Sequence, residues 1–321
     1  VAFFVGPIWS SLMTITKLVT HSGGFHADET LSTVILTKIF PDAKVLRTRD
    51  RDMLIPAADK VIYDVGGDYN AEAQIFDHHQ RPNPLREDGQ PYSSFGLIWA
   101  HYGHAYLAAM DVPASDVDAI HQKFDTNFVL PIDLLDNGAM EPSVAGPLSN
   151  MTFPALLGSL KPVFDDTSPT ADDDAFFAAL LIARTFVEAS VRNQAAKARA
   201  SAIVADAITA AGTSAILELP MGMPYGAVLD KSGADHIMFV VNPRGTEWML
   251  NGIKLSQDTF EQRADLPAAW AGLSDAALEE ASGVTGAKFC HNARFLAVAN
   301  SRDAIMELAR IAVESLAVPA S

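Results

Sequence analysis

In the N-terminal part of the chain, short apolar runs alternate with segments whose apolar residues repeat at helical spacing. Residues 15–20, 43–48, 61–65 and 74–77 are short and contain β-branched or aromatic residues, so each is predicted to be a strand. Between the first two runs, apolar residues recur on one helical face until Pro41 ends the pattern. Short apolar strands that alternate with helices predict a parallel sheet with helices on both faces.

The middle of the chain is predicted to be helical. Residues 95–107 and 113–124 show helical spacing, and a third helix is expected from residue 172 to about residue 211. Three aspartates at 172–174 favour a helix start there, because negative charge complements the N-terminal end of the helix dipole. A helix of this length is expected to connect two domains.

The C-terminal part has the pattern of a small α+β domain. Asn242 to Gly245 predicts a turn between two strands, and residues 303–316 predict a closing helix. The ranges predicted to be strands are 215–219, 236–241, 248–253 and 294–299.

The length of 321 residues suggests two domains, because a domain commonly contains about 150 residues. We predict that residues 13–212 form an α/β domain with the connecting helix, and that residues 213–321 form the smaller α+β domain. Residues 1–12 are apolar, but they have neither the basic start nor the small-residue cleavage site of a signal peptide. We interpret them as a non-native or disordered extension.

The composition is globular but acidic, with a net charge of −16 and a pI of about 4.8. Such a charge does not suit a long nucleic-acid duplex, whose backbone is bound by basic surfaces. It leaves open an acidic substrate held at metal ions, which supply local positive charge. The single cysteine, Cys290, excludes an internal disulfide and favours a reducing, cytoplasmic setting. No apolar run reaches the roughly 18–20 residues that span a bilayer, so no membrane association is expected.

Histidine and aspartate side chains gather at the ends of the predicted strands. A single residue of this kind is more often structural or part of a turn. The carboxyl ends of parallel strands lie at one edge of the sheet, so these side chains are expected to converge in one crevice. Buried carboxylates without a partner are costly, and a cation offsets that cost. The residues concerned are His21, His26, Asp28, Asp64, Asp77, His78 and His79, with Asp133 and Asp136 following later.

This set of ligands predicts two metal ions. Imidazole and carboxylate ligands without a thiolate favour Mn, Fe, Co or Zn over Ca. Six or seven ligands exceed the need of one tetrahedral ion, whereas two ions about 3.5–4 Å apart would use them all. Asp64 is the expected bridging ligand, because its strand lies between the others in the sequence.

Several motifs together resemble a known enzyme family. The segments are 20–29 (THSGGFHADE), 64–67 (DVGG), 76–80 (FDHHQ), 93–97 (SSFGL), 136–138 (DNG), 260–263 (FEQR), 266–273 (LPAAWAGL) and 286–291 (GAKFCH). They resemble the melanocyte-proliferating-gene (Myg-type) family of the DHH phosphoesterase superfamily. The resemblance extends from about Met13 to the end of the chain, and the motifs are highly specific in combination.

The resemblance implies a two-domain fold with the active site in the cleft, and two divalent metal ions. Mn is the favoured ion, with Co, Fe, Zn or Mg as alternatives. The ligands implied for the first ion are His21, His26 and Asp64. The ligands implied for the second ion are Asp28, Asp64, His78 and either Asp136 or Asp133.

Two positions in this implied site need comment. Asp136 is preferred to Asp133, because a small polar residue follows the corresponding aspartate in the pyrophosphatase-like motif. His26 stands where the superfamily usually has an aspartate, which reduces the negative charge of the site. His79 is implied to lie near the substrate, as a proton donor or an electrostatic stabiliser.

The chemistry implied is attack on phosphorus by a water that two metal ions activate. Basic residues of the second domain would neutralise further charge on the phosphate. The candidates for substrate binding are Arg263, His291, Lys231 and Lys254. A surface salt bridge is the alternative role of Arg263, and a structural hydrogen bond is that of His291. The glycine-rich substrate motif of other DHH proteins is absent, which leaves the substrate ligands open.

The leading hypothesis is a metal-dependent phosphoesterase that cleaves phosphodiester bonds of short oligoribonucleotides, similar to a 3'-5' exoribonuclease. The acidic net charge favours a short RNA or a small phosphorylated molecule over a long polymer. A pyrophosphatase-like hydrolase of a small phosphorylated molecule is the first alternative. A non-catalytic, metal-dependent binding protein is the second, and the complete ligand set argues against it. A homodimer is one alternative for the oligomeric state.

Overall fold

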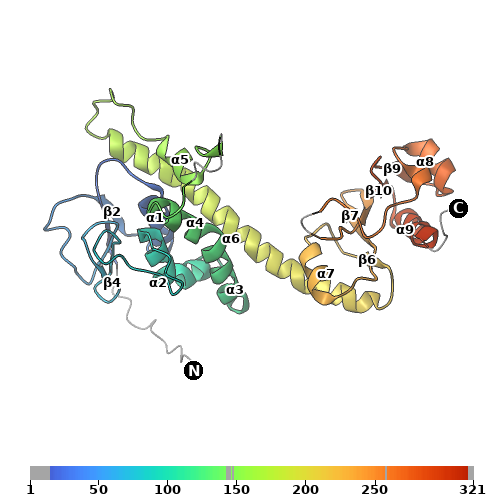
Figure 1. The fold of residues 1–321 in the computed structure, drawn as a ribbon, viewed down its shortest axis with the longest axis horizontal. Helices are drawn as coiled ribbons and strands as arrows, with labels where there is room; N and C mark the ends of the chain where they lie inside the picture. The colour runs from blue at the N-terminus through green and yellow to red at the C-terminus, as the bar shows by residue number, and fades with distance from the viewer. Residues whose placement is uncertain (1–14, 142–145, 147, 257–258, 317–321) are drawn as a thin grey trace. The chain divides into compact units, whose positions relative to one another are not determined.

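The computed structural model describes residues 15–141, 146, 148–256 and 259–316 (Figure 1). The extension predicted at residues 1–12 lies outside the described residues. Contacts within the chain divide it into two compact units, Val1–Ala195 and Ala196–Ser321, and the division falls inside the long helix α6 (Ala171–Ala211). The predicted domain boundary at 212/213, which assigns the whole helix to the first domain, stays a prediction.

The N-terminal unit contains the predicted parallel sheet, with the strand order β2-β1-β3-β5-β4. The strands are β1 (Lys17–Thr20), β2 (Lys44–Arg47), β3 (Lys60–Tyr63), β4 (Tyr69–Asn70) and β5 (Ile75–Phe76). β1, β2, β3 and β5 are parallel, and only β4 pairs in the antiparallel direction. β1, β3 and β5 are therefore neighbours whose carboxyl ends lie at one edge of the sheet.

The two faces of this sheet are buried in different ways. Leu18 and Val19 point to opposite faces because side chains alternate along a strand, and both are fully buried. Leu18 belongs to the large core formed with the helices. Val19 belongs to a small cluster with Ile62 that packs against Leu54 of the loop between β2 and β3. Helices on both faces were expected, but the described chain covers this second face with a loop, because no helix connects β2 to β3.

Five helices of the N-terminal unit pack around the large core before α6 begins. Their bounds are α1 (Ala27–Ile39), α2 (Ser94–Ala109), α3 (Ala114–Phe124), α4 (Leu130–Asp136) and α5 (Phe153–Gly158). A π-helical turn at Asp125–Val129 joins α3 to α4. The sequence pattern predicted α1, α2, α3 and α6, but it missed α4 and α5 because both are only two turns long or less.

The C-terminal unit is the predicted α+β domain, with a mixed sheet of strand order β6-β7-β8-β10-β9. The strands are β6 (Ile216–Glu218), β7 (Phe239–Arg244), β8 (Glu247–Gly252), β9 (Ala287–Cys290) and β10 (Leu296–Ala299). The helices are α7 (Gly226–Ser232), α8 (Asp275–Ser282) and α9 (Arg302–Leu316). α9 packs its buried side chains, including Ile305 and Leu308, into the core of this unit.

Two details of the C-terminal unit differ from the prediction. The turn predicted at Asn242 to Gly245 lies later, because Asn242, Pro243 and Arg244 still pair with β8. Gly245 makes the turn in the left-handed conformation, with φ of 61°, which glycine adopts at little cost. β9 was not predicted, and it places the buried Cys290 in the core.

The described helices include none that is long and apolar enough to cross a membrane.

Candidate metal centre

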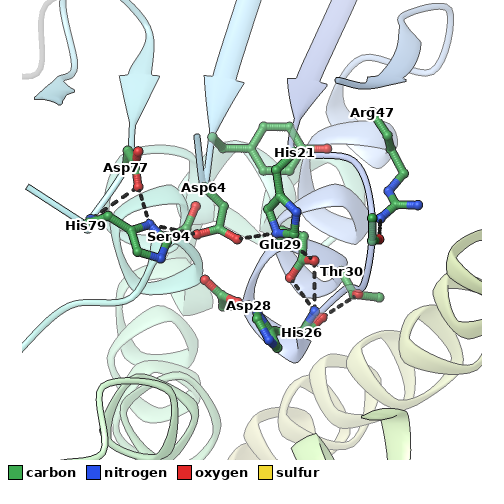
Figure 2. Close-up of polar contacts among 12 residues, drawn as sticks. His21, His26, Asp28, Glu29, Thr30, Arg47, Asp64, Asp77, His79 and Ser94 are labelled. Carbon is green, nitrogen blue, oxygen red and sulfur yellow. Dashed lines mark hydrogen bonds and ion pairs between the residues drawn. The ribbon is translucent and has the colours of Figure 1, made fainter. Parts of the chain in front are cut away.

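Side chains from three neighbouring strand ends meet around the carboxylate of Asp64, as predicted (Figure 2). His21 follows β1, Asp64 follows β3, and His78 follows β5. Oδ2 of Asp64 lies 3.2 Å from Nε2 of His21, and Oδ1 lies 3.4 Å from Nε2 of His78. Asp64 thus lies between two imidazoles and offers one carboxylate oxygen to each side.

The start of helix α1 supplies a second layer of candidate ligands. His26 is the residue before the helix, and its backbone N–H donates to both carboxylate oxygens of Glu29, at 2.8 and 2.9 Å. Oε1 of Glu29 also lies 3.2 Å from Nε2 of His21. Asp28 is buried, and its Oδ2 lies 3.7 Å from Nε2 of His78. Acidic residues in the first turn suit the positive end of the helix dipole.

The turn after β3 fixes the orientation of Asp64. Its φ of 54° is in the left-handed region, which few residues other than glycine, asparagine and aspartate adopt. The next turn residues include Gly66 and Gly67, both at positive φ. The backbone N–H of Gly67 donates a 2.6 Å hydrogen bond to Oδ2 of Asp77. The ends of β3 and β5 are therefore tied together directly beneath the centre.

Asp77 orients the two histidines that follow it. Its Oδ1 accepts hydrogen bonds from the backbone N–H groups of His78 and His79, at 2.8 and 3.2 Å. The same oxygen lies 2.8 Å from Nδ1 of His79. An imidazole whose Nδ1 bonds to a carboxylate presents its Nε2 outward. The side chain of His79 is 63% exposed, so this nitrogen faces the solvent side of the centre.

Helix α4 decides between the two aspartates that the sequence left as alternatives. Oδ2 of Asp136 lies 3.4 Å from Nε2 of His78 and so joins the cluster. Asp133 is fully buried elsewhere, where its carboxylate accepts from Ser93 Oγ at 2.6 Å and from Arg86 Nη2 at 2.7 Å. The structure therefore brings Asp136 to the centre and gives Asp133 a structural role.

Buried oxygens without a hydrogen-bond partner show that the donor set fits a cation. They are both carboxylate oxygens of Asp28 and Oδ1 of Asp64. Buried acceptors are normally satisfied, because an unsatisfied one costs free energy. Four triads offer ligand atoms within 4.8 Å of one another. They are His21/His26/Glu29, His26/Asp28/Asp136, Asp64/His78/His79 and Asp28/Glu29/Asp64.

The protonation behaviour of the metal-free centre reflects its crowded negative charge. Burial raises the pKa of Asp28 well above its usual range, and the charges of Asp64 and Asp136 raise it further. Burial opposes the charged form of His21, but hydrogen bonds to Asp64 and Glu29 outweigh it and raise the pKa to about 10. Burial opposes ionisation of Asp64 too, but hydrogen bonds from His21 and His78 lower its pKa to about 2. Bound cations would relieve the repulsion among these carboxylates.

A cavity of about 570 Å³ opens beside the centre. His26, His78, His79 and Asp136 line one part of it. Apolar residues, including Phe25, line another part, and two cationic side chains, Arg81 and Lys161, also face it. Pockets of this size hold small-molecule ligands.

The structure thus brings together His21, His26, Asp28, Asp64, His78, His79 and Asp136. Sequence reasoning did not select Glu29, although it lies in the 20–29 motif, because one turn of helix was needed to direct it at His21. Nor did it select Arg81 or Lys161, because neither lies at a strand end. Lys161 is separated from the DHH segment by more than 80 residues, so only folding reveals the proximity.

The predicted substrate-binding residues of the C-terminal unit occupy different environments there. Arg263 is only 8% exposed and donates to the backbone oxygens of Ala234 and Ile237, at 2.8 and 3.2 Å. Nδ1 of His291 accepts from the backbone N–H of Ala293 at 3.0 Å. Lys231 lies exposed on α7, and Nζ of Lys254 lies 4.9 Å from the centroid of the exposed Phe260 ring. Their predicted contact with substrate stays a prediction.

Two residues near the centre have structural roles that the sequence did not indicate. Ser93, rather than Ser94, precedes α2, and Ser94 Oγ instead donates to the backbone oxygen of Phe76 at 2.9 Å. The guanidinium of Arg47 donates to the backbone oxygen of Gly23 and, at 2.6 Å, to Oδ1 of Asp173 (Figure 2 shows the Gly23 side). Arg47 therefore ties the loop between His21 and His26 to the first turn of α6.

Comparison with known proteins gives matches along nearly the whole chain. The model of MYG1_exonuc, described as "Uncharacterised protein family (UPF0160)", matches residues 17–313. The "MYG1 exonuclease" of Rattus norvegicus is 30% identical over 338 residues, which cover 97% of this chain and 88% of the rat protein. The "MYG1 protein C694.04c" of Schizosaccharomyces pombe is 29% identical, over 94% of this chain and 98% of that protein.

Among solved structures, the exonuclease RecJ of Thermus thermophilus in complex with Mn²⁺ aligns with 96% of this chain. The alignment covers 53% of that protein, with 13% identity and a TM-score of 0.29. At such a TM-score, the likeness carries no argument about fold or chemistry.

Proposed function

The chain belongs to the MYG1_exonuc family, and from this premise we propose that it is a metal-dependent phosphohydrolase that cleaves phosphodiester bonds of short oligoribonucleotides from one end. One observation carries the proposal. Seven predicted ligand side chains converge beside a cavity, and the central carboxylates of Asp28 and Asp64 keep oxygens free of any hydrogen bond. The exonuclease names of several relatives support the same reaction class.

We propose that two divalent ions bind, with Mn favoured because imidazole and carboxylate ligands suit it. The first ion would be held by His21, His26 and Asp64, with Glu29 close to the same ligands. The second would be held by Asp28, Asp64, His78 and Asp136. Asp64 would serve both ions, because its two oxygens face different imidazoles.

The chain's own residues would divide the catalytic work around that centre. Bound divalent ions would polarise the phosphoryl group and lower the pKa of the attacking water. His79 would protonate the leaving oxygen, since the hydrogen bond to Asp77 raises its pKa and its Nε2 faces the cavity side. Asp77 would position this imidazole and favour its charged form.

Several features favour a short substrate. The acidic net charge opposes binding of a long polyanion. The cavity volume of about 570 Å³ suits one nucleotide rather than a duplex. In the C-terminal unit, the substrate-binding role is proposed for the exposed Lys231 and Lys254 and for His291. Arg263 is a weaker candidate, because backbone oxygens of its own unit already occupy its guanidinium.

The test is an assay of the Mn-loaded protein on four substrates of matched concentration. They are an end-labelled RNA of about five nucleotides, a long RNA, the DNA counterpart of the short RNA, and inorganic pyrophosphate. We expect mononucleotide release from the short RNA, and loss of that activity in Asp64→Asn. Faster turnover of pyrophosphate than of any oligonucleotide would instead support the pyrophosphatase-like alternative. Absence of turnover on every substrate would contradict an enzymatic role.

A further inference from the structure

The cavity beside the metal centre has a cationic side that the proposed metal chemistry does not use. Lys161 and Arg81 both line it, together with Asn83. Arg81 follows the DHH segment by two residues, so it lies on the same loop as His79. Lys161 comes from the segment after α5, and Pro154 and Gly158 of α5 also line the cavity. Two separate parts of the N-terminal unit therefore place a positive charge at one cavity.

The position of Lys161 is fixed by contacts close to the candidate ligands. Its Nζ lies 6.0 Å from the centroid of the Phe25 ring, within the range of a cation–π contact. Phe25 immediately precedes His26 and is fully buried, with its ring packed edge-on against Phe176. The backbone N–H of Lys161 also donates to the oxygen of Gly158. The ammonium is thus held beside the metal centre and is not free to leave with a mobile chain end.

Within the described residues, neither Lys161 nor Arg81 has a carboxylate within 4.0 Å, unlike the other basic residues near the centre. Arg47 pairs with Asp173, and Arg86 pairs with Asp125 and Asp133. The chain has 39 acidic and 23 basic residues, so partners are abundant. Basic side chains that line a cavity without such a partner keep their charge available for an anionic ligand.

We propose that Lys161, assisted by Arg81, binds a phosphate group of the substrate or product in this cavity, next to the metal centre. This inference rests on the proposed function and identifies a subsite for it. The ammonium of Lys161 acts as a compact charge that binds phosphate oxygens, and the guanidinium of Arg81 adds planar donors. Two divalent ions balance the four carboxylates of the centre, so Lys161 and Arg81 then make the cavity attract anions.

The test measures binding of adenosine 5'-monophosphate and of adenosine to the full-length, Mn-loaded protein by titration calorimetry. The difference between the two ligands isolates the phosphate. In Lys161→Met, we expect the Kd of the monophosphate to rise about tenfold and that of adenosine to stay the same. Lys161→Arg should recover most of the affinity, because it keeps the charge. Arg81→Met should raise the Kd of the monophosphate by a smaller factor of about three.

Two controls separate local binding from general effects. Lys123→Met removes one charge from an exposed position of α3 outside this cavity, and should leave both affinities unchanged. Metal analysis should give the same Mn content in every variant, since Lys161 is not a metal ligand. Circular dichroism melts check that Lys161→Met is folded. If that variant does not fold, the comparison of Lys161→Arg and Arg81→Met with the parent protein decides.

The outcomes also distinguish this subsite from the proposed reaction. Unchanged monophosphate binding in Lys161→Met, an equal loss in Lys123→Met, or no preference of the parent protein for the monophosphate over adenosine would each overturn the subsite. Hydrolysis of RNA with unchanged affinities would leave the reaction standing without the subsite. Lys161-dependent monophosphate binding in a protein that hydrolyses nothing would leave the subsite standing without the reaction. In an active protein, Lys161→Met should raise KM more than it lowers kcat.

Discussion

Oδ2 of Asp136 lies 3.4 Å from Nε2 of His78, although one residue ends helix α4 and the other follows strand β5. Asp133, one helical turn earlier, faces the opposite way and bonds to Arg86 and Ser93. The same short helix therefore carries a candidate metal ligand and the anchor that fixes the helix in place. Arg86 donates to Asp125 as well, so this anchor also joins the turn between α3 and α4.

We expect Asp136→Asn and Asp133→Asn to have opposite consequences. Asp136→Asn should lower Mn binding but not the stability of the metal-free protein, because it removes repulsion that contributes to the raised pKa of Asp28. Asp133→Asn should cost about 2–4 kcal/mol of stability, because Arg86 loses a buried charged partner. Urea unfolding in chelator and metal analysis by mass spectrometry measure the two effects. Equal Mn loss in both variants, at unchanged stability, would contradict the division of roles.

Asp64→Asn should abolish turnover and leave no more than one tightly bound Mn per chain. A single carboxylate lies between His21 and His78, so both proposed ions lose a charged ligand. The fold should persist, since asparagine also tolerates the left-handed backbone at this position, where φ is 54°. Mn titration followed by electron paramagnetic resonance gives the stoichiometry. Two tight Mn ions in this variant would remove Asp64 as the bridge.

Mn affinity should increase as the pH rises from about 6 to about 8. In the metal-free protein the pKa of His21 is raised to about 10, so its imidazole is protonated at neutral pH and must lose that proton to bind a metal. Each displaced proton makes the Kd fall about tenfold per pH unit. Calorimetry in buffers of different ionisation enthalpy counts the released protons. A Kd independent of pH over this range would be inconsistent with His21 as a ligand.

The stability of the metal-free protein should respond to pH in the other direction. A histidine whose folded-state pKa is raised from 6.5 to about 10 stabilises the fold fully below pH 6.5. This stabilisation is lost as the pH rises through about 10. Melting temperatures in chelator should therefore fall across this range more steeply for the parent protein than for His21→Asn. Parallel melting curves for the two proteins would contradict the contribution of His21.

His79→Gln should lower kcat by about 10²- to 10⁴-fold, the range typical of lost general acid catalysis. The effect should shrink on a substrate with a good leaving group, such as a nitrophenyl phosphodiester, which departs without protonation. Mn content should stay close to that of the parent protein, because the side chain of His79 is far more exposed than those of His21 and His78. Equal losses on both substrates would assign His79 to binding or electrostatics.

Gly96→Ala should destabilise the protein by about 1–3 kcal/mol, despite the higher helix propensity of alanine. A Cβ at Gly96 would lie 2.2 Å from Oδ2 of Asp133, so the buried bond between Asp133 and Arg86 would have to move. Gly158→Ala is the matched control, because a Cβ there meets nothing within 4 Å. Urea unfolding measures both. A neutral Gly96→Ala would show that this contact accommodates an extra methyl group.

Local patterns in the sequence were enough to predict much of the fold and part of the site. Strand alternation, helical spacing and the three aspartates at 172–174 predicted the parallel sheet and the long helix α6. The rule that parallel strands end at one edge then predicted that His21, Asp64 and His78 converge. These predictions succeeded because they depend on the period of each element and on the direction of the chain, both of which are encoded locally.

Only the tertiary structure decided which side chains around that edge face the centre. Asp133 and Asp136 belong to one short sequence motif, but the packing of α4 turns one toward Arg86 and the other toward His78. Lys161 lies 83 positions after His78, and the packing of α5 places it in the same cavity as that histidine. Such placements depend on contacts between residues distant in sequence, whose free energies no local pattern records. The sequence thus determined the ligand types and the sheet edge, whereas packing selected the ligands and the cations around them.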